Sequence, residues 1–381
     1  MKNHIISADC HIDLVWLPPD LFTANASAQL KDRMPYVVDG EKGSKWVSKN
    51  GSYFGLMNGM GSGGREYVPG EIYRSDRMAS TGLYDDGKKG IRRLTDPGLR
   101  IKDQDLDGVQ SEVLFGILGA SSRLNDPEAA TEVIRIYNEW LADFCSSYPE
   151  RLLGIACIPS DSMDNALAEV KRIVERGYTR GFELPLTEGM VPLWDPYWEP
   201  LWAMVEESGL PLHFHTVGAC KPDVSKQPPI VQRAAWAVYI TGFQIQMAQV
   251  LLAVIFSGVL ERYPKLQVVI AESGIGWIPY ILEHMDVEWE DQFKDLSLTM
   301  KPSAYWHRQC RATYQTDNVG IKLLTELGVD NVMWGSDFPH PDGVWPDSQD
   351  FIKRELGHLP DETRGKIVYQ NAAKLYGVIA D

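Results

Sequence analysis

The segment SADCHIDLVWLPPDL, residues 7–21, carries three groups that can do chemistry, Asp9, His11 and Asp13, at alternate positions. Alternate residues of a β-strand point to the same side, so Asp9 and His11 are expected to share one face of a strand. Burying an uncompensated carboxylate costs several kcal/mol. The pattern therefore predicts a partner that stabilises these acids.

More carboxylates and imidazoles lie at the ends of later apolar runs. They are Glu183, His213, His215, Glu272 and Asp337, with His340 just beyond. Each alone has a simple structural explanation, such as a buried hydrogen-bonded histidine or a helix N-cap. Taken together, they are the ligand types that a hard to borderline divalent cation requires. We therefore expect a cation to stabilise the buried acids.

The elements that would position these residues alternate along the chain. Eight short apolar runs predict parallel strands buried on both faces: 5–12, 111–118, 152–159, 180–185, 210–216, 266–273, 311–317 and 331–339. Amphipathic helical patterns lie between them, at 126–149, 162–177, 195–209 and 319–328. Eight such units predict an α/β fold, a (β/α)8 TIM barrel whose strand ends meet at one mouth.

The chain of 381 residues is expected to form a single barrel domain, residues 1–381. Residues from about 30 to 103 break the alternation and are rich in Gly, Ser, Asp and aromatics. A long loop of this kind is usually functional, so we interpret it as a lid or wall of the active site. A surface excursion without a role is the alternative.

Composition limits the partners. The net charge of −15 argues against nucleic acid and an anionic membrane surface. Five cysteines without a CxxC pair favour a reducing compartment, and the N-terminus shows no signal sequence. The apolar stretch 247–260 is too short to cross a bilayer. We expect a cytoplasmic protein with a small-molecule substrate and no membrane partner.

Several motifs resemble a known family: ADCHIDL at the start, LPLHFHT at 210–216, and MWGSDFPHPDGVWP at 333–346. With these residues the chain resembles the amidohydrolase superfamily, in particular its amidohydrolase-2 branch, which includes aminocarboxymuconate-semialdehyde decarboxylase. The resemblance implies a (β/α)8 barrel with a divalent metal at the mouth. By resemblance, the metal ligands are Asp9, His11, His215 and Asp337.

Further ligands and the metal itself stay open. His213, Glu183 and Glu272 are additional candidate ligands. The resemblance favours zinc, with manganese or iron as alternatives, and one ion, or two if Glu183 and Glu272 both bind. The family usually forms homo-oligomers, so we expect a homodimer, with the 235–260 region as the candidate interface.

Two departures from the family pattern decide the ranking of reactions. Many members carry H-x-H on the first strand, where this chain has D-x-H-x-D, and the decarboxylases typically have a sixth-strand histidine where this chain has Glu272. Hydrolysis by a metal-activated water is therefore the first prediction, with Asp337 or Glu272 accepting the proton and His340 assisting. The expected substrate is a small cyclic or aromatic organic acid, amide or lactone.

Three alternatives remain on the sequence alone. They are a non-oxidative decarboxylase (carboxy-lyase) of the same family, a dinuclear iron or manganese oxygenase, and a non-catalytic metal-stabilised subunit. Trp277, Trp345 and Asp13 are the predicted substrate-binding residues, because aromatic side chains can wall a pocket for a ring.

Overall fold

The structure, a computed structural model, describes residues 4–41, 43–49, 53–61, 65–187, 189–216 and 224–378, and their side chains except those of Tyr53 and Phe54. Its centre is an eight-stranded sheet with strand order β1-β5-β6-β7-β8-β9-β10-β11, in which every pair is parallel. The strands are β1 Ile6–His11, β5 Ser111–Phe115, β6 Leu152–Cys157, β7 Thr179–Glu183, β8 Leu212–His215, β9 Val268–Ala271, β10 Cys310–Tyr314 and β11 Val332–Trp334. All eight predicted strands are present.

The two edges of this sheet meet just beyond the last strand. Cys10 of β1 forms an isolated parallel bridge with Phe338. The amide of His11 donates to Phe338 O at 2.7 Å, and the amide of Asp337 donates to Asp9 O at 2.8 Å. The sheet is therefore a nearly closed barrel, which confirms the predicted (β/α)8 fold and brings Asp9 beside Asp337.

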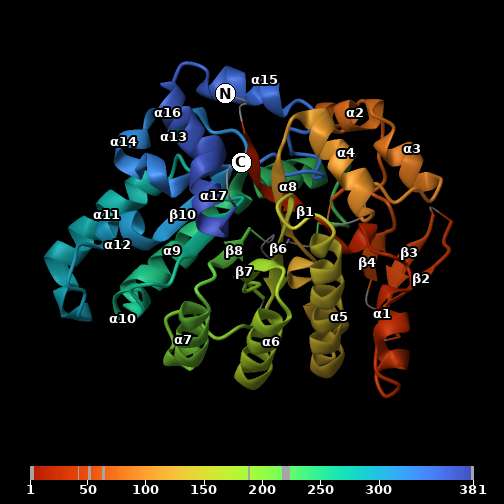
Figure 1. Ribbon diagram of the computed structural model, residues 1–381, viewed down its shortest axis with the longest axis horizontal. Coiled ribbons are helices and arrows are strands. Elements are labelled where there is room, and N and C mark those ends of the chain that lie inside the picture. Colours follow the sequence, from red (N-terminus) through yellow and green to blue (C-terminus); the bar gives the residue numbers. More distant parts are fainter. Residues whose placement is uncertain are drawn as a thin grey trace.

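Helices surround the barrel, as Figure 1 shows for α5, α6 and α7, which lie side by side. The helices that follow β5 are α5 Pro127–Ser146, α6 Met163–Arg176, α7 Glu199–Ser208, α8 Pro229–Gly242, α9 Met247–Phe256, α10 Val259–Arg262, α11 Ile278–Gln292, α12 Pro302–Gln309, α13 Asn318–Lys322, α14 Leu324–Leu327, α15 Ser348–Leu356, α16 Asp361–Gly365 and α17 Asn371–Tyr376. Local sequence sets their ends: the Asp126 side chain accepts from the amide of Ala129 and Pro127 opens α5.

Apolar side chains fill both sides of the barrel wall. Ile6, Ala8, Val113 and Phe115 belong to a buried cluster that also contains Tyr376 of α17. A larger cluster lies where the strands meet the surrounding helices. Strands that are buried on both faces consist of nearly continuous apolar residues. This is why their positions could be predicted from the sequence.

The insertion between β1 and β5 has secondary structure of its own. It contains the three-stranded antiparallel sheet β2 Tyr36–Val38, β3 Lys45–Val47 and β4 Tyr53–Leu56, and the helices α2 Tyr73–Ser80, α3 Leu83–Lys88 and α4 Pro97–Asp107; α1 Leu21–Asn25 precedes it. A long unstructured loop was expected here. Trp46, fully buried, anchors the small sheet, and Arg77 of α2 forms an ion pair with Asp347 at 2.7 Å. The insertion is thus a folded layer against the barrel.

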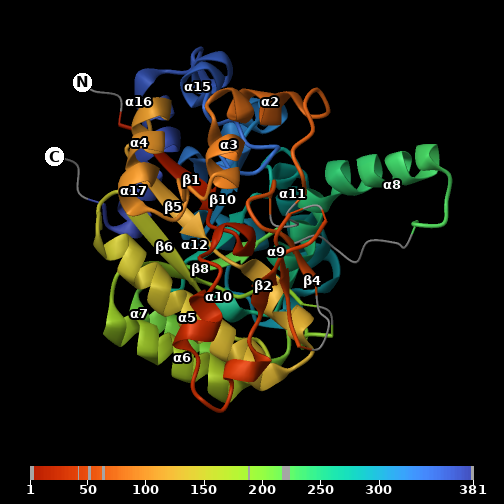
Figure 2. The same cartoon turned by 90° about the vertical axis from the view of Figure 1, so that its right-hand side faces the viewer.

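Helix α8 leaves the barrel and projects from it, as Figure 2 shows. None of its residues is buried, whereas α9 is mostly buried. The helical stretch Pro229–Phe256 is long and apolar enough, by length and composition alone, to cross a membrane, and 39% of its most apolar window is buried. The sequence prediction considered only 247–260 and therefore missed this length.

Candidate metal centre

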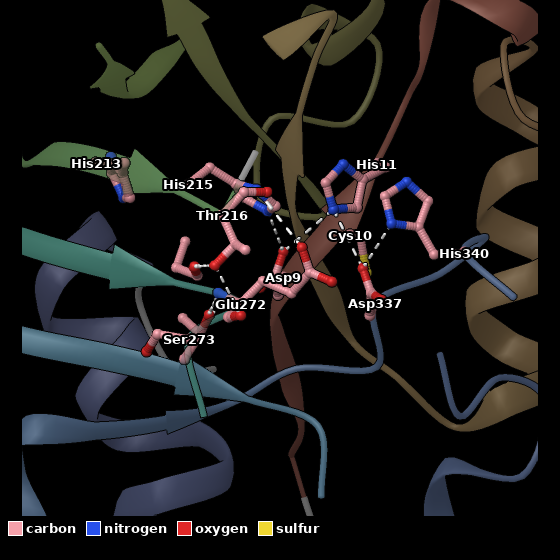
Figure 3. A network of polar contacts seen from close by, with 12 residues as sticks. Asp9, Cys10, His11, His213, His215, Thr216, Glu272, Ser273, Asp337 and His340 are labelled. Atoms are coloured by element: carbon pink, nitrogen blue, oxygen red, sulfur yellow. Dashed lines mark hydrogen bonds and ion pairs between the residues drawn. The ribbon is translucent and has the colours of Figure 1, made fainter. Parts of the chain in front are cut away.

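Four predicted metal ligands converge at the mouth of the barrel, as Figure 3 shows. Asp9 and His11 lie near the end of β1, His215 ends β8, and Asp337 follows β11. His11 Nε2 lies 3.4 Å from Asp9 Oδ1 and 3.2 Å from Asp337 Oδ1, and His215 Nε2 lies 3.4 Å from Asp9 Oδ1. Two carboxylates and two imidazoles therefore point their donor atoms at one small volume.

Two of these four residues have side-chain atoms without hydrogen-bond partners. His11 and Asp337 are fully buried, yet both ring nitrogens of His11 and both carboxylate oxygens of Asp337 make no hydrogen bond within the described part of the chain. Buried polar groups are ordinarily paired, and unpaired ones call for an explanation such as an ion. The residues present therefore fit a divalent cation.

Side chains around the four ligands orient Asp9 and set its charge. Thr313 of β10 donates from Oγ1 to Asp9 Oδ2 at 2.8 Å. Burial opposes the charged form of Asp9, but the neighbouring His215 and His11 outweigh it and hold the pKa of this carboxyl far below its usual range. Asp9 is thus a fixed carboxylate, which suits a ligand.

His340 lies between the carboxylates of Asp13 and Asp337 and contacts both. Its Nε2 is 2.9 Å from Asp13 Oδ2, and its Nδ1 is 3.2 Å from Asp337 Oδ1. Although burial acts in the opposite direction, the carboxylates of Asp13 and Asp337 raise the pKa of His340 well above its usual value. The side chains Asp13, His340 and Asp337 can therefore hold a proton next to the ligand group.

Glu272 belongs to a carboxylate cluster on the other side of Asp337. Glu272, Asp337, His340 and Asp342 each offer one ligand atom, all within 4.8 Å of one another. Burial, followed by Asp337 and Asp342, raises the pKa of Glu272 well above its usual value. Glu272 and Asp337 both have positive φ angles, of 50° and 57°, which are uncommon away from glycine and are often found at functional sites.

Two of the additional ligand candidates lie away from this cluster. Figure 3 shows His213 apart from the other labelled residues. Its Nδ1 lies 2.9 Å from Phe182 O and its Nε2 lies 3.0 Å from the Tyr376 hydroxyl, so both nitrogens are already engaged. Burial lowers its pKa to about 4. Glu183 contacts the thiol of Cys157 at 3.5 Å, and burial raises its pKa. Neither joins a metal-ligating group among the described residues.

Of the three predicted substrate-binding residues, only Asp13 lines the cavity above the ligands. Trp345 is buried, its Nε1 donates to Asp103 O at 3.2 Å, and it packs on Phe338 with ring centroids 4.3 Å apart. The indole of Trp277 donates to Ser273 O at 2.7 Å. The structure thus places both tryptophans in packing roles, with Trp345 joining the insertion to the barrel.

Sequence reasoning missed other residues that line this cavity. Arg123 follows β5, Trp194 follows β7, and Trp236 and Tyr239 come from α8. Asp342 also lines it and lies two positions beyond His340, in HPDG, which was the one local signal available. The other four residues do not directly follow a strand, and no sequence motif marks their positions.

Comparisons with known proteins show the family to which the chain belongs. The sequence profile of the amidohydrolase family matches residues 9–378. A gamma-resorcylate decarboxylase of Rhodococcus jostii is 27% identical over 314 residues, covering 75% of this chain and 88% of that protein. The 2-amino-3-carboxymuconate-6-semialdehyde decarboxylase of Dictyostelium discoideum is 22% identical over 287 residues, covering 74% and 77%.

Solved structures share the fold. A 5-carboxyvanillate decarboxylase from Sphingomonas paucimobilis superposes with a TM-score of 0.69 at 19% identity, over 99% of both chains. The 5-carboxyvanillate decarboxylase of Novosphingobium aromaticivorans, in complex with manganese and a nitrobenzoic acid derivative, superposes with a TM-score of 0.62 at 23% identity, over 79% of this chain and 90% of that one.

Proposed function

This chain is an enzyme of the amidohydrolase family, and on that premise we propose that it is a divalent-metal-dependent, non-oxidative decarboxylase of a hydroxylated aromatic acid. The observation that carries the proposal is a chain of side-chain contacts from Asp13 through His340 to Asp337. The carboxylate oxygens of Asp337, at the end of this chain, are buried beside the other predicted metal ligands. The two relatives named above are decarboxylases. This supports decarboxylation over hydrolysis, which was the first prediction from the sequence.

The reaction needs one proton and releases one CO2. The bond between the ring carbon and the carboxylate carbon breaks, CO2 leaves, and the electron pair stays on the ring carbon until that carbon takes a proton. A divalent cation, when bound, supplies the positive charge that holds the substrate carboxylate and its neighbouring hydroxyl. The chain must therefore supply a proton donor aimed at the ring carbon.

Asp337 and His340 are the side chains that we propose as the proton donors. The Asp337 carboxylate is buried and touches His340 Nδ1 at 3.2 Å, so a proton on His340 can reach Asp337 and from there the ring carbon. Asp13 holds the other ring nitrogen and fixes the orientation of the imidazole. The net proton comes from solvent through this chain of contacts in each cycle.

We propose manganese as the working metal, bound as one ion by Asp9, His11, His215 and Asp337. Manganese is the ion named with the related decarboxylase structures, and a set rich in carboxylates suits it. A second ion, which the oxygenase alternative requires, would have to use Glu272, His340 and Asp342 in place of the predicted Glu183. A metal count by plasma mass spectrometry separates the two cases.

The test is turnover by manganese-loaded protein. Salicylate, 2,6-dihydroxybenzoate and 5-carboxyvanillate are incubated with enzyme, and the phenol product is measured by chromatography together with released CO2. Lactones and aryl amides are assayed beside them. Decarboxylation that is lost on chelation and restored by manganese is the expected result, whereas hydrolysis of a lactone or amide with no CO2 from any acid would overturn the proposal.

A further inference from the structure

The cavity above the ligand group is far larger than a single ring requires. Its volume is about 1250 Å³, and it reaches the site at Asp13, Glu272 and His340. A cavity of about 150 Å³ is enough to bind benzene. A benzoic acid with one or two hydroxyl groups would therefore occupy only a small part of it, at the end where the ligands lie.

The remainder of the cavity has walls from three neighbouring segments. Leu118 comes from the segment after β5, Trp194 from the segment after β7, and Phe243 and Val250 from the stretch that joins α8 to α9 and from α9 itself. These side chains are apolar or aromatic. Apolar and aromatic residues make up more than half of the lining, although Arg65, Arg123, Gln246 and Gln249 also belong to it.

We propose that the substrate carries an extended apolar group, of the size of a second ring or larger, which lies between Leu118, Trp194 and Phe243. This inference rests on the proposed decarboxylation and names its substrate class: a hydroxylated ring acid joined to a bulky apolar substituent. The carboxylate end faces His340 and the ligand group, because the acids and imidazole are gathered there.

The physical reason is that these apolar side chains offer contact area that a single ring cannot cover. Removing apolar surface from water stabilises a complex by roughly 25 cal/mol per Å². Trp194, 63% exposed, has most of its indole available for such a contact. The cavity is continuous with the proposed catalytic groups, so a substituent on the reacting ring extends directly into it.

Binding of the two product types tests the inference without relying on turnover. Phenol and 4-phenylphenol are the decarboxylation products of salicylate and 5-phenylsalicylate, and their affinities for the manganese-loaded protein can be measured by calorimetry. We expect 4-phenylphenol to bind at least tenfold more tightly. Equal affinities, or no binding of 4-phenylphenol, would overturn the inference.

Two variants locate the contact. Trp194→Ala removes an exposed indole and is expected to lower the affinity for 4-phenylphenol at least fivefold, with a much smaller change for phenol. Phe243→Ala is expected to do the same. Tyr280→Ala is the matched control, because Tyr280 is 67% exposed on α11 and does not line the cavity. A loss of the same size for both ligands would overturn the assignment of Trp194 and Phe243 to the apolar substituent.

Turnover measurements then separate the proposed decarboxylation from the proposed preference for a bulky apolar substituent. We expect kcat/KM for 5-phenylsalicylate to exceed that for salicylate at least tenfold, and this ratio to fall in Trp194→Ala. Decarboxylation of salicylate with no preference for the larger acid would overturn the inference and leave the decarboxylase assignment standing. Tight binding of 4-phenylphenol with no CO2 from either acid would overturn the decarboxylase assignment instead.

Discussion

The imidazole rings of His11 and His340 lie stacked, with centroids 3.9 Å apart and planes inclined by 19°, yet they face different partners. His11 Nε2 lies among the carboxylates of Asp9 and Asp337, whereas His340 spans Asp13 and Asp337. The two rings share Asp337, and His11 Nδ1 also lies 3.7 Å from Asp13 Oδ1, but only His11 is close to Asp9 as well. We assign metal binding to His11 and proton delivery to His340.

This division predicts different losses for two matched substitutions. His11→Asn should lower bound manganese at least tenfold and abolish turnover, because a ligand is removed from the group. His340→Asn should keep bound manganese within about twofold and lower kcat by about 10²–10⁴, the usual contribution of a proton donor. Metal content by plasma mass spectrometry and steady-state kinetics check both.

His284→Asn is the control, because its side chain is 54% exposed on α11. It should change neither quantity. Loss of manganese from His340→Asn to the same extent as from His11→Asn would contradict the division, and would place His340 among the ligands of the carboxylate cluster that contains Glu272.

Close packing behind Asp9 gives a second prediction. A Cβ atom on Gly335 would lie 2.5 Å from Asp9 Cβ and 2.9 Å from Asp9 N, distances that real contacts do not reach. Gly335→Ala must therefore displace Asp9, and we expect manganese affinity to fall at least tenfold although no ligand atom is changed. Competition with a chelating dye measures the affinity.

Gly242→Ala is the matched control, since a Cβ there meets nothing within 4 Å. Its manganese affinity should equal that of the unchanged protein. Unaltered affinity in Gly335→Ala, with circular dichroism showing an intact fold, would mean that Asp9 does not need its observed position.

The sequence predicted the strands and which polar side chains gather at their ends, because both depend on local pattern. Buried parallel strands read as apolar runs, and polar residues at their ends stand out against them. His213 shows the limit of this reasoning. It shares a face with His215, as alternation requires, but two residues along a strand amount to about 6.6 Å. That step places His213 deeper, next to Tyr376, a contact that no local pattern reveals.

The insertion and the cavity walls were harder to predict for the same reason. Trp345 is aromatic and lies just after Asp337 in the chain, yet it packs under the insertion, with its indole bonded to Asp103 O. Thr313 has no charge to draw attention, although it bonds directly to Asp9. Contacts between segments far apart in the chain decide such roles, and a single sequence does not contain them.

A buried ion pair lies next to the backbone of His11. Breaking this pair is expected to lower the stability of the protein strongly. Arg100 Nε lies 2.7 Å from Glu112 Oε2, both side chains are buried, and Arg100 Nη1 donates to His11 O at 3.1 Å. Arg100→Met leaves the Glu112 charge unpaired, so the free energy of unfolding should fall by about 3–5 kcal/mol. Denaturant unfolding followed by circular dichroism measures it.

The double variant Arg100→Met with Glu112→Met should recover at least half of that loss, because no unpaired charge remains. The exposed pair formed by Arg77 and Asp347 serves as the comparison, and Arg77→Ala should cost less than about 1 kcal/mol. If the double variant were no more stable than Arg100→Met, the loss would have to come from the contact with His11 O.

Asp107 at the end of α4 makes stability depend on pH. Burial raises the pKa of its carboxyl from 3.8 to about 7, although Ser348 opposes this by donating from its amide at 2.9 Å and from its hydroxyl at 2.5 Å. Between these two pKa values the folded protein binds more protons at Asp107 than the unfolded chain does. This contribution to stability is therefore full below pH 4 and is lost as the pH rises to 7.

Asp107→Asn removes this titration and keeps a side chain that can bond to Ser348. Relative to the unchanged protein, the variant should gain stability as the pH rises from 5 to 8, by about 2–4 kcal/mol. Ser348→Ala removes the hydroxyl hydrogen bond that favours the charged form and keeps the one from the amide, so the pKa of Asp107 should rise further and the fall in stability should extend to higher pH. Unfolding free energies measured at pH 5, 6, 7 and 8 give both slopes. Parallel curves for Asp107→Asn and the unchanged protein would show that Asp107 is charged in the fold at pH 5, with the hydrogen bonds from Ser348 outweighing its burial.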